Sequence, residues 1–167
     1  GSKWGLSLSY IPQPSPDGLA QAYILARDFL NGAPSAMVLG DNIFFGHGLP
    51  EILAEADARA DGGTVFGYRV ADPERYGVVD FAPDGSVRAL IEKPADPPSP
   101  FAVTGLYFLD GTAPDRAAQV RPSARGELEI TSLLESYLHD GTLRVTKMGR
   151  GFAWLDTGTH ASLLDAG

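Results

Sequence analysis

Two aspartates, Asp41 and Asp156, each follow a short apolar run that is typical of a β-strand. In open α/β sheets, ligands bind beyond the carboxyl ends of the strands, so both carboxylates could meet at one site. Carboxylate oxygens are ligands that hard divalent cations prefer, and such a cation can bridge to phosphate groups. Either aspartate alone is more simply interpreted as a cap of the next element. The pair therefore indicates a metal site only if the fold brings the two together.

Two basic residues, Lys93 and Arg125, could bind a phosphate. Lys93 stands before a proline at a strand end, where it could place one charge against a phosphate, although a solvated lysine is the simpler interpretation. Arg125 precedes a helix, where a cation opposes the helix dipole, which makes anion binding more plausible than for most loop arginines. Tyr76 and Gly77 could bring the backbone close to a ligand, but Tyr76 could equally pack in the core.

Residues 14–23, PSPDGLAQAY, form a stiff turn that runs directly into helix-forming residues. Proline fixes φ and glycine allows positive φ, so such a turn is ordered before anything binds. Asp17 is placed to cap the helix that follows. Two interpretations remain open at this point: an ordinary helix entry, or a surface on which a ligand lies.

The first half of the chain alternates strand and helix patterns. The expected elements are a strand at 6–11, a helix at 19–30, a strand at 36–39, a helix at 49–60 and a strand at 62–70. This alternation predicts the βαβ units of an open α/β sheet. The continuous apolar run at 36–39 is typical of a strand buried on both faces in a parallel sheet.

The second half contains the strongest turn prediction, a β-hairpin that reverses at Pro83-Asp84-Gly85. The elements expected after it are a strand at 101–110, a helix at 126–141, a strand at 142–149 and a last helix capped by Thr157 or Thr159. Taken together, the patterns predict an α/β domain with a mixed sheet.

The composition limits the possible partners. The 167 residues include no cysteine and carry a formal net charge of −8. The absence of cysteine excludes disulfides and thiolate metal sites, which fits a cytoplasmic protein. The negative charge argues against nucleic acid or an anionic membrane as a partner, and no apolar run approaches the ~18 residues of a membrane span. A phosphate ligand stays possible, because a metal ion can lie between carboxylates and phosphates.

Seven motifs, taken in order, resemble those of the bacterial glucose-1-phosphate thymidylyltransferases, which are sugar nucleotidyltransferases that make dTDP-glucose. The motifs are QPSPDGLAQA, LGDNIFFGH, DPERYGVVDF, EKP, AVTGLYF, RGELEIT and MGRGFAWLDTGTH. The resemblance implies a Rossmann-like nucleotidyltransferase fold, with a mixed, mostly parallel sheet, helices on both faces and an inserted β-hairpin. It also implies that glucose 1-phosphate attacks the α-phosphorus of dTTP, with Mg²⁺ as cofactor and dTDP-glucose and pyrophosphate as products.

The resemblance assigns roles to particular residues. Asp41 and Asp156 would hold Mg²⁺, and Lys93 and Arg125 would bind the phosphate of the sugar phosphate as catalytic residues. The nucleotide would lie against Gln13, Pro14, Asp17, Gly18 and Leu39. The hexose would lie against Tyr76, Gly77, Glu92, Val103 and Trp154. Under this interpretation the stiff turn is both a helix entry and the surface that recognises the base.

The sequence also departs from the family pattern. Family members begin with a strand and a glycine-rich loop, GGxGTR, and continue after the last motif with helices implicated in oligomer contacts; neither occurs here. We therefore expect residues 1–167 to form a single, partial nucleotidyltransferase domain, which associates with itself as the tetrameric family does, because an open sheet edge invites pairing. The alternative is a domain that binds a sugar nucleotide or a partner without catalysis.

Overall fold

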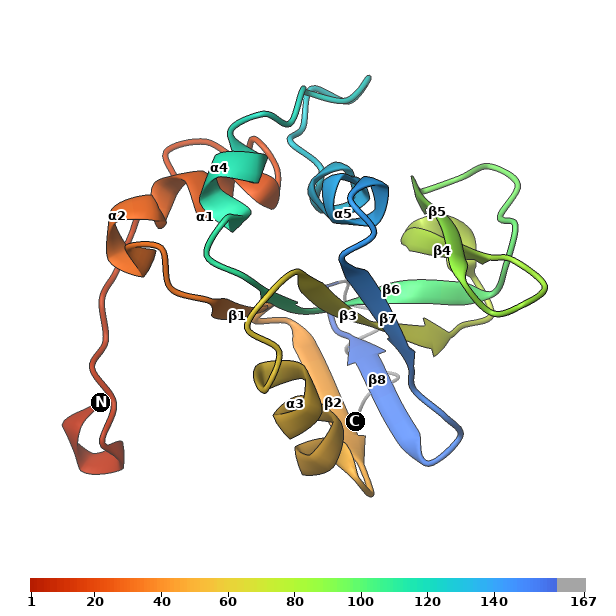
Figure 1. The fold of residues 1–167 in the computed structure, drawn as a ribbon, viewed down its shortest axis with the longest axis horizontal. Helices are drawn as coiled ribbons and strands as arrows, with labels where there is room; N and C mark the ends of the chain where they lie inside the picture. Colours follow the sequence, from red (N-terminus) through yellow and green to blue (C-terminus); the bar gives the residue numbers. More distant parts are fainter. Residues whose placement is uncertain (159–167) are drawn as a thin grey trace.

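The computed structural model describes residues 1–158, whose helices and strands are shown in Figure 1. The helices are α1 (Ala20–Leu25), α2 (Arg27–Leu30), α3 (Leu49–Asp57), α4 (Ala113–Ala117) and α5 (Ile130–His139), with 3₁₀ turns at Ser2–Trp4 and Pro73–Arg75. The strands are β1 (Ser35–Val38), β2 (Asn42–Gly46), β3 (Gly63–Arg69), β4 (Gly77–Phe81), β5 (Val87–Glu92), β6 (Phe101–Leu109), β7 (Leu143–Lys147) and β8 (Phe152–Asp156).

One six-stranded sheet and one two-stranded ribbon organise the chain. The sheet has the order β5-β4-β6-β3-β7, and β1 pairs with the far half of β6. Within the described part, β3 and β7 run parallel and the remaining pairs are antiparallel. The ribbon joins β2 to β8. Helices α1, α2, α4 and α5 lie on one side of the sheet, and α3 lies with the ribbon on the other (Figure 1).

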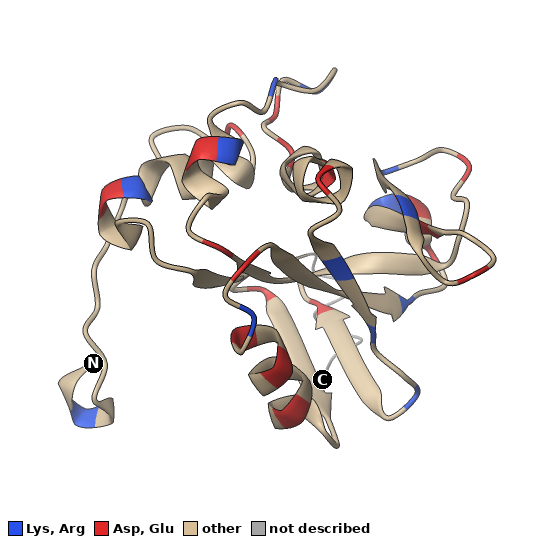
Figure 2. Cartoon of the chain, viewed as in Figure 1, with Lys and Arg blue, Asp and Glu red and all other residues tan. Residues whose placement is uncertain are grey.

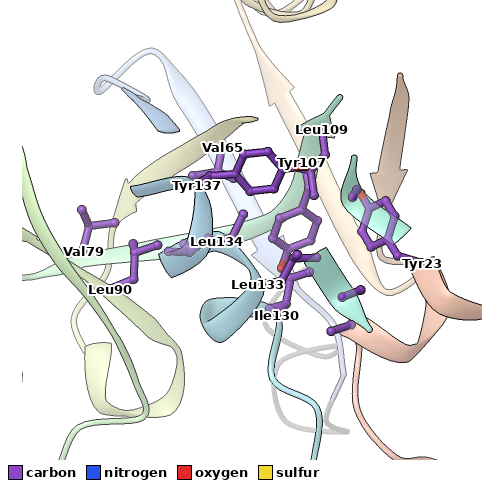
Figure 3. Packing of buried hydrophobic residues seen from close by; sticks show 14 residues of the cluster. Tyr23, Val65, Val79, Leu90, Tyr107, Leu109, Ile130, Leu133, Leu134 and Tyr137 are labelled. Carbon is purple, nitrogen blue, oxygen red and sulfur yellow. The ribbon is translucent and has the colours of Figure 1, made fainter. Parts of the chain in front are cut away.

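The main core lies between the sheet and α5. This helix buries Ile130, Leu133, Leu134 and Tyr137, whose spacing of three and four residues places them on one face. They pack against β3, β5 and β6, as Figure 3 shows. A second cluster, centred on Phe66, joins the other face of the sheet to α3. The core therefore fixes α5 over the sheet, and this also fixes the end of the loop that leads into α5.

The structure confirms the α/β class with a mixed sheet and the hairpin around residues 83–85. It corrects the expectation of a mostly parallel sheet, because β6 is paired antiparallel on both of its sides. It also corrects the environment of β1. This strand pairs antiparallel with β6, and its outward side chains are exposed, Val38 by 59%, so it is not buried on both faces.

Three local expectations were wrong or displaced. Residues 6–11 form no strand, because no strand among the described residues lies beside them to pair, and Tyr10 is 87% exposed. The helix at 19–30 is divided into α1 and α2 at Ala26, and Leu19 rather than Asp17 occupies its N-cap position. The helix expected from Gly126 begins only at Ile130. The last expected helix lies outside the described residues.

Candidate active site

A cavity of about 220 Å³ gathers most of the candidate residues. It is lined by Leu39, Asp41, Tyr76, Gly77, Glu92, Lys93, Val103, Arg125, Trp154 and Asp156. Residues not singled out from the sequence also line it, among them Asn42, Arg75, Tyr107, Glu129 and Thr131. Side chains that are more than one hundred residues apart in the sequence therefore share one concave site, which is where binding and catalytic sites are usually found.

The two aspartates meet where the ribbon begins. Asn42 pairs with Asp156 in the β2–β8 register, so Asp41 lies beside the end of β8. A side-chain carbon placed on Gly158 would lie 2.9 Å from Asp41 Oδ2 and 3.1 Å from Asp156 Oδ1. Figure 2 shows acidic segments at these ends of β2 and β8. Both carboxylates thus face the same small volume, which meets the condition that the sequence left open.

The donor set at this point fits a hard divalent cation. Two carboxylates offer oxygen ligands to one volume, and such cations complete their coordination with water and substrate phosphates. Among residues 1–158 no third carboxylate or imidazole joins them in a group. A site of this kind would leave most ligand positions open for a nucleotide.

Asn42 connects three parts of the site, although the sequence analysis did not single it out. Its Oδ1 accepts hydrogen bonds from the Gly105 amide at 3.0 Å and from Trp154 Nε1 at 2.6 Å. Its Nδ2 donates to Asp41 Oδ1 at 2.9 Å. One amide side chain therefore fixes the indole against β6 and orients the carboxylate. Its place directly after Asp41 was the only feature of the sequence that pointed to it.

Aromatic rings form one wall of the cavity. Trp154 is buried, and its ring packs edge-on against Tyr76, with 5.2 Å between the ring centroids. Burial raises the pKa of the Tyr76 hydroxyl, partly offset by Arg75, whose guanidinium lies over the Tyr76 ring. A wall of this kind suits the apolar face of a sugar or a base.

Glu92 lies at the base of the cavity, opposite Gly77 in the β4–β5 hairpin. The Thr131 hydroxyl donates to Glu92 Oε2 at 3.0 Å. A side-chain carbon on Gly77 would lie 2.6 Å from Thr131 Cγ2, so glycine leaves the room that this contact needs. Burial raises the pKa of Glu92, and the neighbouring Glu129 adds to the rise, while Thr131 and the nearby cations oppose it.

We expect Glu92→Gln to stabilise the protein more at pH 7 than at pH 4. The pKa of Glu92 lies above its ordinary value of 4.5 in the folded protein, so folding disfavours the ionised form. Below about pH 4.5 Glu92 is mostly protonated in the folded and the unfolded wild type, so it costs no stability there. As the pH rises through the folded pKa, Glu92 ionises and the free energy of unfolding of wild type falls. Glutamine keeps the acceptor for Thr131 and does not ionise. Urea unfolding midpoints of both proteins at the two pH values measure the difference; an equal gap at both would contradict the expectation.

Lys93 and Arg125 approach the cavity from different loops. Lys93 has a φ of 41°, in the left-handed region that a side chain rarely adopts, and its amide donates to the Tyr76 carbonyl at 3.0 Å. Strained backbone of this kind is concentrated at functional sites. Arg125 lies within a tight turn in which the Gly126 amide donates to the Ser123 carbonyl, and Glu129 raises the pKa of the Arg125 guanidinium by hydrogen bonding to it.

The turn that begins at Gln13 lies beside the cavity and does not line it. Gln13 Nε2 donates to the Gly18 carbonyl at 3.2 Å and to Gln21 Oε1 at 2.6 Å, and Gln21 Nε2 donates to Asp17 Oδ2 at 2.9 Å. Gly18 has a φ of 109°, and a side-chain carbon there would lie 2.4 Å from the Leu128 carbonyl oxygen. Only glycine allows this close approach, which holds the turn against the loop that carries Glu127 and Glu129.

Comparison with known proteins identifies relatives of this chain. The sequence profile of the nucleotidyl transferase family matches residues 1–167. The chain is 60% identical over 166 residues to a glucose-1-phosphate thymidylyltransferase of Xanthomonas campestris pv. campestris (strain B100), a match that covers 99% of this chain and 56% of that protein. The chain spans a little more than half the length of the curated relatives it matches.

Solved structures share the fold. A crystal structure assigned to a glucose-1-phosphate thymidylyltransferase from Bacillus anthracis, in complex with sucrose, superposes with a TM-score of 0.85 at 37% identity. That match covers 99% of this chain and 65% of the solved one. A UDP-glucose pyrophosphorylase complexed with UDP-glucose gives a TM-score of 0.83 at 22% identity, covering 95% and 63%, and shows a likeness of fold alone.

Proposed function

Because the chain belongs to the nucleotidyl transferase family, we propose that it carries the metal-binding and sugar-phosphate parts of the active site of a glucose-1-phosphate thymidylyltransferase. The observation that supports this most is that two carboxylates, Asp41 and Asp156, and two cations, Lys93 and Arg125, line one cavity. In this proposal residues 1–167 belong to a single nucleotidyltransferase domain, and the reaction takes place in the cytoplasm, where nucleoside triphosphates and sugar phosphates are made.

The reaction requires positioning more than covalent chemistry by the protein. A phosphate oxygen of glucose 1-phosphate attacks the α-phosphorus of dTTP, the bond to the β-phosphate oxygen breaks, and pyrophosphate leaves with dTDP-glucose as product. Lys93 and Arg125 bind the attacking phosphate and hold it in line with the leaving group. Glu92 accepts hydrogen bonds from hydroxyl groups of the hexose, which lies between Tyr76 and Val103 with Trp154 as a wall.

The nucleotide lies on the turn beside the cavity. Gln13 and Gly18 face the thymine edge, Pro14 and Asp17 keep the turn ordered, and Leu39 packs against the nucleoside. Because the turn is already fixed by its own hydrogen bonds, binding orders little further chain. Asp41 and Asp156 would hold a divalent cation, in this proposal Mg²⁺, which neutralises charge on the phosphates when bound.

We also propose that the protein associates with itself. The outer edge of β1 carries no partner among residues 1–158, and Val38 of this strand is exposed, as are Phe45 and Ile43 of the ribbon strand β2. An open sheet edge with apolar side chains is suited to contact with a second copy of the chain. No helix among the described residues is long and apolar enough to cross a membrane.

The proposed function is tested by incubating the protein with dTTP, glucose 1-phosphate and Mg²⁺ and measuring both pyrophosphate and dTDP-glucose. We expect equal amounts of the two products and no pyrophosphate when the sugar phosphate is left out. UTP in place of dTTP tests the choice of base. Tight binding of dTDP-glucose without turnover would instead support a domain that only binds sugar nucleotides. Pyrophosphate release that is independent of glucose 1-phosphate would contradict transfer.

A further inference from the structure

We propose that Glu129 is the positioning residue for Arg125: it holds one edge of the guanidinium and thereby presents the other edge to a phosphate in the cavity. The inference rests on the proposed function for the identity of the ligand, a sugar phosphate. The contact between the two side chains is a feature of the structure itself, and it can be tested separately.

Glu129 is only 6% exposed, yet it carries a carboxylate. Its Oε1 accepts hydrogen bonds from Arg125 Nε at 3.2 Å, from Arg125 Nη2 at 2.9 Å and from the Ser123 hydroxyl at 2.7 Å. Its Oε2 lies 2.9 Å from Arg125 Nη2. A buried carboxylate is costly unless its lone pairs are occupied, and here one arginine and one hydroxyl occupy them.

The pairing leaves one part of the guanidinium available. Glu129 takes Nε and Nη2, whereas Arg125 Nη1 has no hydrogen-bond partner among the residues that the structure describes. Glu92 and Glu127 also approach Nη2, at 3.3 and 3.4 Å, but each makes a single, longer contact. An arginine held on one edge keeps its planar fork oriented, which is what recognition of a phosphate requires.

The position of Glu129 in the chain supports a role other than helix capping. Glu129 is the N-cap residue of α5, but its side chain makes no capping hydrogen bond to the helix. The side chain turns instead to Arg125, four residues earlier, and Ser123 helps to hold both because its Oγ accepts from the Arg125 amide at 3.2 Å. The buried, packed α5 therefore supplies the fixed point from which the arginine is oriented.

The alternative is that the ion pair only closes the loop at residues 123–129. The two roles differ in a double-mutant cycle on the affinity for glucose 1-phosphate. We expect Glu129→Gln to weaken binding roughly 10- to 100-fold, the range for hydrogen bonds to charged groups, while dTTP affinity changes less than about twofold. In the Arg125→Ala background the same substitution should have almost no further effect, because its partner is already gone.

Two further variants serve as a control and as a conservative substitution. Glu135→Gln makes the same change on α5, away from the cavity, and should bind like wild type. Glu129→Asp keeps the buried charge but shortens its reach, and we expect it to fold and to recover part of the lost affinity. Equal weakening by Glu129→Gln with and without Arg125 would show a purely structural role and overturn the inference, as would wild-type affinity in Glu129→Gln.

A readout that does not depend on the reaction separates this inference from the proposed function. In ¹⁵N-labelled protein, the Arg125 Nε–H signal should exchange slowly with water, and the exchange should become fast in Glu129→Gln. If wild type makes no dTDP-glucose, the proposed function fails, and affinity for inorganic phosphate then takes the place of glucose 1-phosphate in the cycle. Phosphate binding that Glu129→Gln leaves unchanged, or no phosphate binding by wild type, would overturn the inference as well.

Discussion

Replacing either Asp41 or Asp156 by asparagine is expected to lower the rate of nucleotidyl transfer by about 10³-fold. Both carboxylates face one small volume, so each would supply one of the anionic ligands of a shared cation. Weakening the hold on a cation that neutralises charge in the transition state has a cost of this order. Asparagine keeps an oxygen that can accept the hydrogen bond from Asn42 to Asp41, or that from the Gly158 amide to Asp156, so the fold should be preserved.

The measurement is initial rate against Mg²⁺ concentration, accompanied by thermal unfolding to check that each variant is folded. Asp28→Asn, on the exposed helix α2, is the matched control and should behave like wild type. The Mg²⁺ requirement of both active-site variants should move to higher concentration. If both variants kept the wild-type rate and Mg²⁺ dependence, the pair would not be a metal site, whatever its geometry.

From the sequence, each aspartate lies at the end of an apolar run, which raised the possibility that the two meet at one site, and only the fold could decide whether they do. The sequence did not predict β2 or Asn42. The residues of β2 form a strand through their pairing with β8, more than one hundred residues away, and no local pattern encodes that register. Residues 6–11 have the alternating pattern of a strand but form none, because no strand among residues 1–158 lies beside them to pair.

The contacts of Arg125 could not be predicted from the sequence either. Interpreting residues 126–141 as one helix gave Glu129 no role in the site. The structure begins α5 only at Ile130 and buries the Glu129 carboxylate against the arginine. The sequence correctly predicted a helix in this region, but the start of the helix depends on tertiary contacts such as that between Leu128 and Asp17, whose backbones hydrogen bond at 2.7 Å. Tertiary contacts of this kind account for the missed parts of the site.

Lys93→Ala is expected to raise the KM for glucose 1-phosphate by roughly 100-fold, because a charge-assisted contact to the phosphate is lost. Lys93→Arg keeps the charge and should lose much less. KM for dTTP should change little in either variant, since the proposed nucleotide site is the turn that begins at Gln13. Steady-state kinetics with each substrate varied in turn distinguishes the two effects.

Two substitutions of Lys93 can separate the effect of its charge from the effect of its strained backbone. Lys93 has a φ of 41°, which costs a residue with a side chain about 1 kcal/mol and costs glycine almost nothing. The free energy of unfolding, measured with urea, should therefore be about 1 kcal/mol higher for Lys93→Gly than for Lys93→Ala. Both variants should lose sugar-phosphate affinity equally. If Lys93→Gly bound glucose 1-phosphate like wild type, the backbone rather than the ammonium group would hold the phosphate. Equal loss in both variants would show that the ammonium group of Lys93, and not its backbone conformation, binds the phosphate.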